Sequence, residues 1–120
     1  MITPIFPVIE LLDRLAIAEI KFQRTNANQE ELQWYQRQVD ALDMQLVQQE
    51  FEKLKDIHNQ IWDLESDLKT GVEHKHSLEE IGRRAIEIRN LNNRRIALKN
   101  AMAEAMQCPV REIKQDHLSQ

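Results

Sequence analysis

Glycine and proline are scarce in this chain of 120 residues. It has two glycines and three prolines, and residues 8–108 contain no proline. Sandwiches, barrels and alternating α/β folds need turn residues every dozen positions or fewer, which this composition does not supply. With 42% apolar and 30% charged residues, the chain can nevertheless bury a core and fold. We therefore expect a single all-α domain over residues 1–120.

Cysteine, excess positive charge and long apolar runs are also missing. A single cysteine, Cys108, excludes an intrachain disulfide framework and a multi-cysteine zinc site. The formal net charge of −4 argues against general binding to nucleic acid or to anionic membranes. No segment approaches the ~20 apolar residues of a membrane-spanning helix, and the first residues lack the basic leader of a signal peptide. We expect a cytoplasmic protein without a membrane span that does not bind nucleic acid.

Apolar residues recur at three- and four-residue spacing along most of the chain, which is typical of amphipathic helices. We expect a first helix over about 8–25, ending at polar residues, and a last helix over about 77–106, opened by the capping pair Ser77 and Glu80. The predicted buried side of the last helix holds seven apolar residues: Ile81, Ala85, Ile88, Leu91, Leu98, Met102 and Ala105. Residues 107–120 are predicted to form a polar tail.

Residues 29–70 lie between these two helices and contain no helix breaker. Two heptad seams, typical of a coiled coil, run through this segment and differ in phase by one four-residue step. One continuous helix with a stutter accommodates the step, and so does a helix broken near 46–51. We favour the continuous helix, because glutamine and glutamate are good helix formers. Its ~42 residues would span ~63 Å at ~1.5 Å per residue, giving an elongated antiparallel helical bundle that buries further apolar surface as a homodimer.

Residues that are not simply apolar interrupt the seams of all three helices. They are Glu10, Asp13, Arg14 and Glu19 on the first helix, Asn59, Trp62 and Glu65 on the central one, and Asn92, Arg95 and Lys99 on the last. Burying a charge without a partner is costly, so Glu19 and Arg95 should each have a partner of opposite charge, and they could be each other's partner. Two interpretations stay open. These residues form a structural polar layer that fixes helix register, or a site for an anionic or sugar-like ligand with Trp62 as a platform.

The last helix is basic and the central stretch is acidic. Residues 83–99 hold six bases and one acid, whereas residues 29–68 hold ten acids and three bases. We expect these helices to lie side by side and to complement each other's charge. A phosphate or nucleic-acid surface is the weaker alternative, because no aromatic residues are interleaved with the arginines.

Patterns for catalysis and metal binding are poorly represented. The only Glu-x-x-His spacing, Glu73 to His76, falls in a predicted loop, whereas a di-iron bundle needs such pairs on helices. Glu10 and Asp13 have the spacing with which helical nucleotide pyrophosphohydrolases hold magnesium, but no second convincing pair exists. Cys108 has no histidine near it in sequence, so a nucleophilic triad is not supported. We expect no cofactor, no metal and no catalytic residue.

Three blocks of the sequence resemble a small bacterial helical family, a domain of unknown function. They are ELLDRLAIAEIK from Glu10 to Lys21, HNQIWDLESDLK from His58 to Lys69, and NNRRIALK from Asn92 to Lys99, followed by EIK at 112–114. Members of that family are often encoded beside, or fused to, glycosyltransferases of lipopolysaccharide and cell-surface polysaccharide synthesis. Arg14, Ser66 and Asn93 stand where the family has a lysine and two acids, which counts against an acidic magnesium site.

The resemblance implies a context, surface-polysaccharide synthesis, but no activity. We predict a non-catalytic helical accessory protein that binds a partner, such as a glycosyltransferase, or a second copy of itself through its helical faces. The alternative is a ligand-binding or enzymatic bundle that acts on a nucleotide-sugar or another phosphate-bearing small molecule. A closed layer of mutually paired polar residues would favour the first hypothesis, and a concave pocket with unpaired donors around Trp62 the second.

Overall fold

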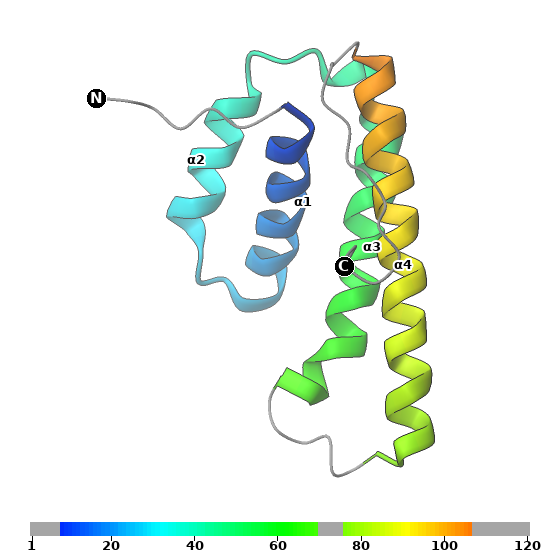
Figure 1. The fold of residues 1–120 in the computed structure, drawn as a ribbon. Helices are drawn as coiled ribbons and strands as arrows, with labels where there is room; N and C mark the ends of the chain where they lie inside the picture. Colours follow the sequence, from blue (N-terminus) through cyan, green and yellow to red (C-terminus); the bar gives the residue numbers. More distant parts are fainter. Residues whose placement is uncertain (1–7, 70–75, 107–120) are drawn as a thin grey trace, which may run out of the picture.

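The computed structural model describes residues 8–69 and 76–106 (Figure 1). Within these ranges the regular structure is helical throughout, so the all-α helical bundle is confirmed. The elements are α1 (Val8–Thr25), α2 (Gln29–Val39), the 3-10 turn η1 (Met44–Leu46), α3 (Gln48–Lys69) and α4 (Leu78–Ala105). Among the described helices, none combines the length and the apolar character needed to cross a bilayer. The predicted tail over 107–120, with Cys108, lies outside the described residues.

The helices form two antiparallel hairpins. α2 folds back along α1, and α4 runs back beside α3, as expected from the sequence (Figure 1). α1 lies against both α3 and α4 and thereby joins the two hairpins. The α3–α4 hairpin is the longer one, so its lower part in Figure 1 extends beyond the α1–α2 hairpin.

The turn between α1 and α2 falls where the sequence predicted the first helix to end. Asn26 adopts a left-handed conformation with φ 57°, which asparagine tolerates better than most residues. Its backbone N–H donates to the carbonyl of Phe22 at 2.9 Å. Two residues later, the Nδ2 of Asn28 donates to the Ala18 carbonyl and to the Glu31 carboxylate, both at 3.1 Å. These bonds fasten the turn to both helices.

The central stretch is not one helix, so the continuous helix that we favoured is wrong. The chain turns over residues 40–47, which begins N-terminal to the break considered at 46–51. Asp43 starts the 3-10 turn by accepting a hydrogen bond from the Gln45 N–H at 3.1 Å. Aspartate competes with helix geometry in this way, because its short side chain can bond to the neighbouring backbone. The longest dimension of the protein is consequently 46 Å.

Apolar burial explains why the chain turns here. One cluster collects residues from all four helices and from the turn: Ile9, Leu12, Leu15, Ala16, Ala18, Leu32, Val39, Val47, Phe51, Leu54, Met102 and Ala103. In a continuous helix, Leu32 and Leu54 would lie ~33 Å apart and could not share this cluster. Burial stabilises the fold by ~25 cal/mol per Å² of apolar surface, which outweighs the helix propensity of the glutamine-rich segment.

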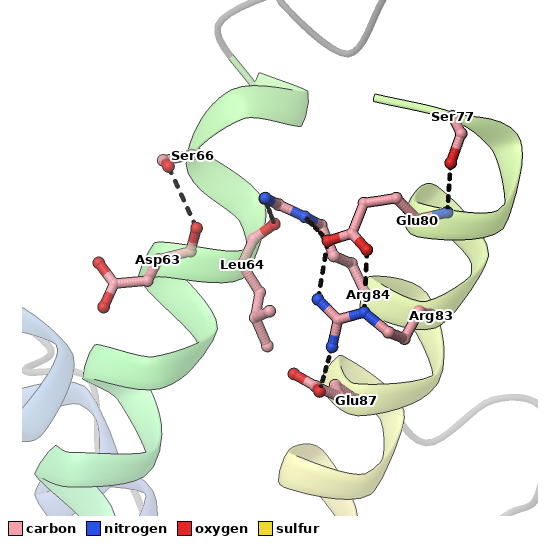
Figure 2. Close-up of polar contacts among 8 residues, drawn as sticks. All are labelled: Asp63, Leu64, Ser66, Ser77, Glu80, Arg83, Arg84 and Glu87. Atoms are coloured by element: carbon pink, nitrogen blue, oxygen red, sulfur yellow. Dashed lines mark hydrogen bonds and ion pairs between the residues drawn. The ribbon is translucent and has the colours of Figure 1, made fainter. Parts of the chain in front are cut away.

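α4 starts with the predicted cap and is then held by ion pairs along its first turns (Figure 2). The Ser77 Oγ accepts a hydrogen bond from the Glu80 N–H at 3.1 Å. The Glu80 carboxylate accepts hydrogen bonds from Arg83 and Arg84. Arg84 also reaches α3, where its guanidinium donates to the Leu64 carbonyl at 3.4 Å. This end of the molecule is therefore held by polar contacts near its surface.

The buried side of α4 differs in part from the predicted one. Ala85 and Ala105 are exposed, whereas Ile96 and Ala103 are buried in their place. Ala85 is exposed because α1 stands beside the C-terminal half of α4 and does not reach the N-terminal half (Figure 1). Along the uncovered N-terminal half, Ile86 keeps 52% of its surface exposed.

Candidate functional site

The carboxylate of Asp13 on α1 joins three helices. Asp13 is buried, with only 2% of its surface exposed. From α3, the Nε2 of His58 lies 2.8 Å from the Asp13 Oδ1, and donates to it when that nitrogen carries the hydrogen. From α4, Arg95 donates to Oδ2 at 3.3 Å, and the Lys99 Nζ lies 3.7 Å from the same oxygen. The carboxylate thus fixes the positions of α3 and α4 relative to α1.

The pKa of Asp13 is lowered from its ordinary value. Burial alone would raise this pKa, because it penalises the charged form. The hydrogen bond with His58 and the positive charges of the three partners together outweigh burial. Asp13 therefore stays ionised at neutral pH and accepts hydrogen bonds without donating any.

Glu10 extends this arrangement towards the surface. The Lys99 Nζ donates to the Glu10 Oε2 at 3.0 Å, and the Arg14 Nε lies 3.6 Å from Oε1. Lys99 is buried, with 5% of its surface exposed, and an ammonium is tolerated there only when it is paired. We call Glu10, Asp13, His58, Arg95 and Lys99 the Asp13 cluster.

Glu19, another sequence candidate, has a partner of its own. Its carboxylate accepts a hydrogen bond from the Lys55 Nζ of α3 at 3.3 Å. The prediction that Glu19 and Arg95 each have a partner of opposite charge is confirmed. The partners are Lys55 for Glu19 and Asp13 for Arg95.

Asn59 and Trp62 on α3 are held by Arg24 from the end of α1. The Asn59 Oδ1 accepts hydrogen bonds from the Nε and Nη2 of Arg24 at 2.9 and 2.8 Å. The same guanidinium pairs with Asp63 at 2.7 Å and lies over the Trp62 ring, 5.7 Å from its centroid. Such a cation–π contact adds to the stability of the pair and fixes the indole.

A cleft of about 410 Å³ opens beside the Asp13 cluster, where α1, α3 and α4 meet. Its apolar walls are Ile17, Ile20, Ile61, Trp62 and Ile88, and its polar lining is Lys21, His58, Glu65, Asn92 and Arg95. Since His58 and Arg95 contact Asp13, the part of the cleft that they line is also the edge of the cluster. We call this the Trp62 cleft.

The structure thus divides the sequence candidates into two adjoining groups. Four belong to the Asp13 cluster, with Arg14 at its edge, and four line the Trp62 cleft; Arg95 belongs to both. Glu19 and Asn59 lie outside both groups and are paired with Lys55 and Arg24. The structure therefore shows a layer of paired charges, which favours the first hypothesis, and beside it a concave cleft whose basic lining residues Lys21, His58 and Arg95 are themselves paired with acids.

His58 is the member that sequence reasoning missed, because it has no neighbouring metal-ligand pattern. The signal that could have found it is helical spacing. His58 lies four residues before Trp62 and seven before Glu65, which places all three on one face of α3.

The basic residues of α4 are paired in a way that the charge balance did not predict. Arg95 and Lys99 pair with acids of α1, and Arg83 pairs with Glu80 and Glu87 of α4 itself. The side-by-side placement of α3 and α4 is confirmed. However, the acids that pair with Arg95 and Lys99 come from α1. The charge balance predicted from the sequence compared α4 with the central stretch only, and so did not include them.

The acids of the site face cations. Within residues 8–69 and 76–106, no group of three or more His, Cys, Asp or Glu side chains is placed to hold a metal ion. Glu10 and Asp13, whose spacing matches a magnesium-binding pair, both lie within 4 Å of the Lys99 ammonium.

No family model, curated protein or solved structure matches the chain. The resemblance to the bacterial family associated with surface-polysaccharide glycosyltransferases therefore stays a prediction.

Proposed function

We propose that this chain is a non-catalytic helical interaction protein that acts as a homodimer in bacterial surface-polysaccharide synthesis. The main support is the Asp13 cluster, in which acids and bases from three helices pair with one another. Buried pairs of this kind fix the register of packed helices. A carboxyl group that acts as a general acid near neutral pH needs a raised pKa, and the pKa of Asp13 is lowered. The polar residues are thus suited to holding the bundle together.

A surface for the second copy is available on the α3–α4 hairpin. Two grooves of about 460 and 390 Å³ lie along it, and all of their lining residues belong to α3 or α4. These residues are Lys53, Asp56, Ile57, Gln60, Glu87, Asn90, Leu91, Asn93, Arg94, Ala97 and Leu98. Two hairpins that dock through this surface would build a four-helix bundle across a twofold axis.

Charge also favours a second copy over an unrelated partner on this surface. The grooves carry Lys53 and Arg94 beside Asp56 and Glu87, so both signs occur on the same surface. In a twofold dimer each patch meets its own copy, and a mixed patch can then pair with itself. The wider partner that we propose, a glycosyltransferase, is supported by the sequence resemblance.

The dimer is tested by placing a charge in the groove. Ala97 is exposed and lines the larger groove, so Ala97→Glu would put a carboxylate at the centre of the proposed interface. Ala41→Glu is the matched control, because Ala41 is exposed in the turn after α2, away from both grooves. The measurement is the mass in solution by light scattering at micromolar concentration.

We expect the unaltered chain and Ala41→Glu to show twice the 14.2 kDa mass of one chain, and Ala97→Glu to show 14.2 kDa. A monomeric unaltered chain would contradict the proposal. A dimer that persists in Ala97→Glu would show that the interface lies elsewhere.

A further inference from the structure

We propose that the Trp62 cleft binds a small organic anion. The apolar body of the ligand would lie between the isoleucines and Trp62, and its carboxylate or phosphate group would bind at Arg95. The cleft lies between α1, α3 and α4, whereas the surface proposed for dimerisation is lined by α3 and α4 alone. The two proposals can therefore fail independently.

The size and the walls of the cleft suit a small molecule. Its volume of about 410 Å³ falls within the ~300–1,000 Å³ of ligand pockets. Ile20 forms its buried floor, while Ile17, Ile61 and Ile88 are half-buried and keep apolar surface in contact with solvent. Covering this surface with an apolar ligand is favourable, because it removes hydrocarbon from water.

The aromatic platform is already ordered. Trp62 lies beneath the guanidinium of Arg24, which is tied to Asn59 and Asp63 by hydrogen bonds of 2.7–2.9 Å. A ligand that packs on the indole would therefore lose little affinity to the ordering of side chains. This is the pre-organisation expected of a binding site.

The end of the cleft next to the Asp13 cluster favours a negative group. Arg95 and His58 line this end and are held by Asp13 behind them. A guanidinium is planar, carries five N–H donors and binds carboxylate and phosphate groups well. Lys21 also lines the cleft and pairs with Glu31 at 3.3 Å, and Glu65 is the one acid of the lining.

The experiment uses Trp62 as its own reporter. The chain has two tryptophans, so Trp34→Phe leaves Trp62 as the only one. Phenyl phosphate is the probe, since it combines an aromatic body with a dianion. Inorganic phosphate lacks the body and benzyl alcohol lacks the charge, and phenylacetate replaces the phosphate with a carboxylate.

We expect a saturable change in Trp62 emission with phenyl phosphate, and affinities lower by ~10-fold or more for inorganic phosphate and benzyl alcohol. Equal binding of phenylacetate would extend the site to carboxylates, and its loss would restrict the site to phosphates. The absence of a saturable change with both aromatic anions would overturn the proposal. Equal binding of benzyl alcohol would overturn its anionic part.

Two isoleucines of α4 provide matched variants. Ile88 lines the cleft, whereas Ile86, two residues earlier, is 52% exposed and outside it. In the Trp34→Phe background, Ile88→Phe fills the cleft and should weaken phenyl phosphate binding by ~10-fold or more, while Ile86→Phe should change it by less than ~2-fold. Equal affinities for these two variants would place the probe elsewhere and overturn the proposal.

A second measurement does not depend on the folding of a variant. Amide chemical shifts of the unaltered chain, recorded during titration with phenyl phosphate, should change most at residues that line the cleft. The signal of the Trp62 indole N–H should shift as well, and that of the Trp34 indole N–H should not. Changes concentrated at Trp34, or along the α3–α4 grooves, would contradict the assignment.

Discussion

Asp13 and Glu80 are each paired with two or more basic side chains, but Asp13 lies in the interior and Glu80 near the surface. Asp13 is buried and its partners come from α3 and α4. Glu80 lies near the surface of α4, and its partners Arg83 and Arg84 belong to the same helix (Figure 2). We call Glu80, Arg83, Arg84 and Glu87 the Glu80 cluster. The Asp13 cluster joins three helices, whereas the Glu80 cluster lies along one helix and reaches α3 through Arg84.

The pKa values of the two carboxyls move in the same direction and would not reveal this difference. Hydrogen bonds from Arg83 and Arg84 lower the pKa of Glu80 to about 2. Burial opposes the lowering at Asp13, where His58 and the cations of α4 outweigh it. In solvent, water and salt can replace a lost partner, whereas in the interior a lost partner leaves a charge buried. The comparison teaches that burial, more than the pKa, decides how much a charge pair contributes to the fold.

The largest expected effect follows from removing the buried acid. Asp13→Ala removes the carboxylate that contacts His58, Arg95 and Lys99. We expect a loss of about 3–5 kcal/mol in the free energy of unfolding, which is typical of breaking a buried pair. Urea unfolding followed by circular dichroism measures it. A loss below ~1 kcal/mol would show that the Asp13 contacts contribute no more to stability than a surface ion pair does.

The two clusters should also differ in how much stability they lose at low pH. Because the pKa of Asp13 is lower in the folded chain, its contribution is complete above its ordinary pKa of 3.8 and is lost as the pH falls through the lowered value. We expect the urea midpoint to fall below about pH 4, and Asp13→Asn to remove part of this dependence. Glu80→Gln should remove less of it, since the Glu80 pairs lie near the surface, where water and salt weaken them. If both variants changed the pH dependence equally, the buried carboxyl and the carboxyl near the surface would contribute alike.

A smaller effect is expected at the start of α4. Ser77→Ala removes the hydrogen bond that the Glu80 N–H donates to the Ser77 Oγ. Loss of such a cap costs ~1 kcal/mol, and Ser77→Asp should retain most of the stability because aspartate caps equally well. The free energy of unfolding of both variants tests this. Equal losses in the two would show that the cap does not carry the effect.

The smallest effect is expected for the Glu80 carboxylate itself. Glu80→Gln removes the charge that pairs with Arg83 and Arg84. Ion pairs near the surface typically contribute little to stability, because the charges stay hydrated and the long side chains lose freedom, so we expect little or no shift of the thermal midpoint. A clear destabilisation would mean that the Glu80 cluster fixes α4 against α3, through Arg84 and the Leu64 carbonyl.

The parts of the fold that depend on local chemistry could be predicted from the sequence. The end of α1 at Asn26 and the cap at Ser77 are set by residues within one turn of each other. The turn over residues 40–47 could not, although Asp43 was a signal for it. That turn is decided by the burial of Val39 and Val47 in a core shared with α1, and the sequence contains no direct record of which helices meet.

The candidate site shows the same division. Helical spacing correctly placed Asn92, Arg95 and Lys99 on one side of α4. It offered Glu19 as an acid that could face Arg95, whereas the acid that does so is Asp13. These acids lie six residues apart, which turns them about 240° from each other around the helix. Only the rotation of α1 against its neighbours decides which of them faces α4, and that rotation is a tertiary property.

The structural role of the Asp13 cluster is tested most directly by a double-mutant cycle. It compares the free energies of unfolding of the unaltered chain, Asp13→Asn, Arg95→Gln and the double variant, with Glu80→Gln and Arg83→Gln as the matched surface cycle. We expect a coupling of ~1 kcal/mol or more between Asp13 and Arg95, and no measurable coupling in the surface cycle. Additive effects at Asp13 and Arg95 would contradict a polar layer that locks the three helices together.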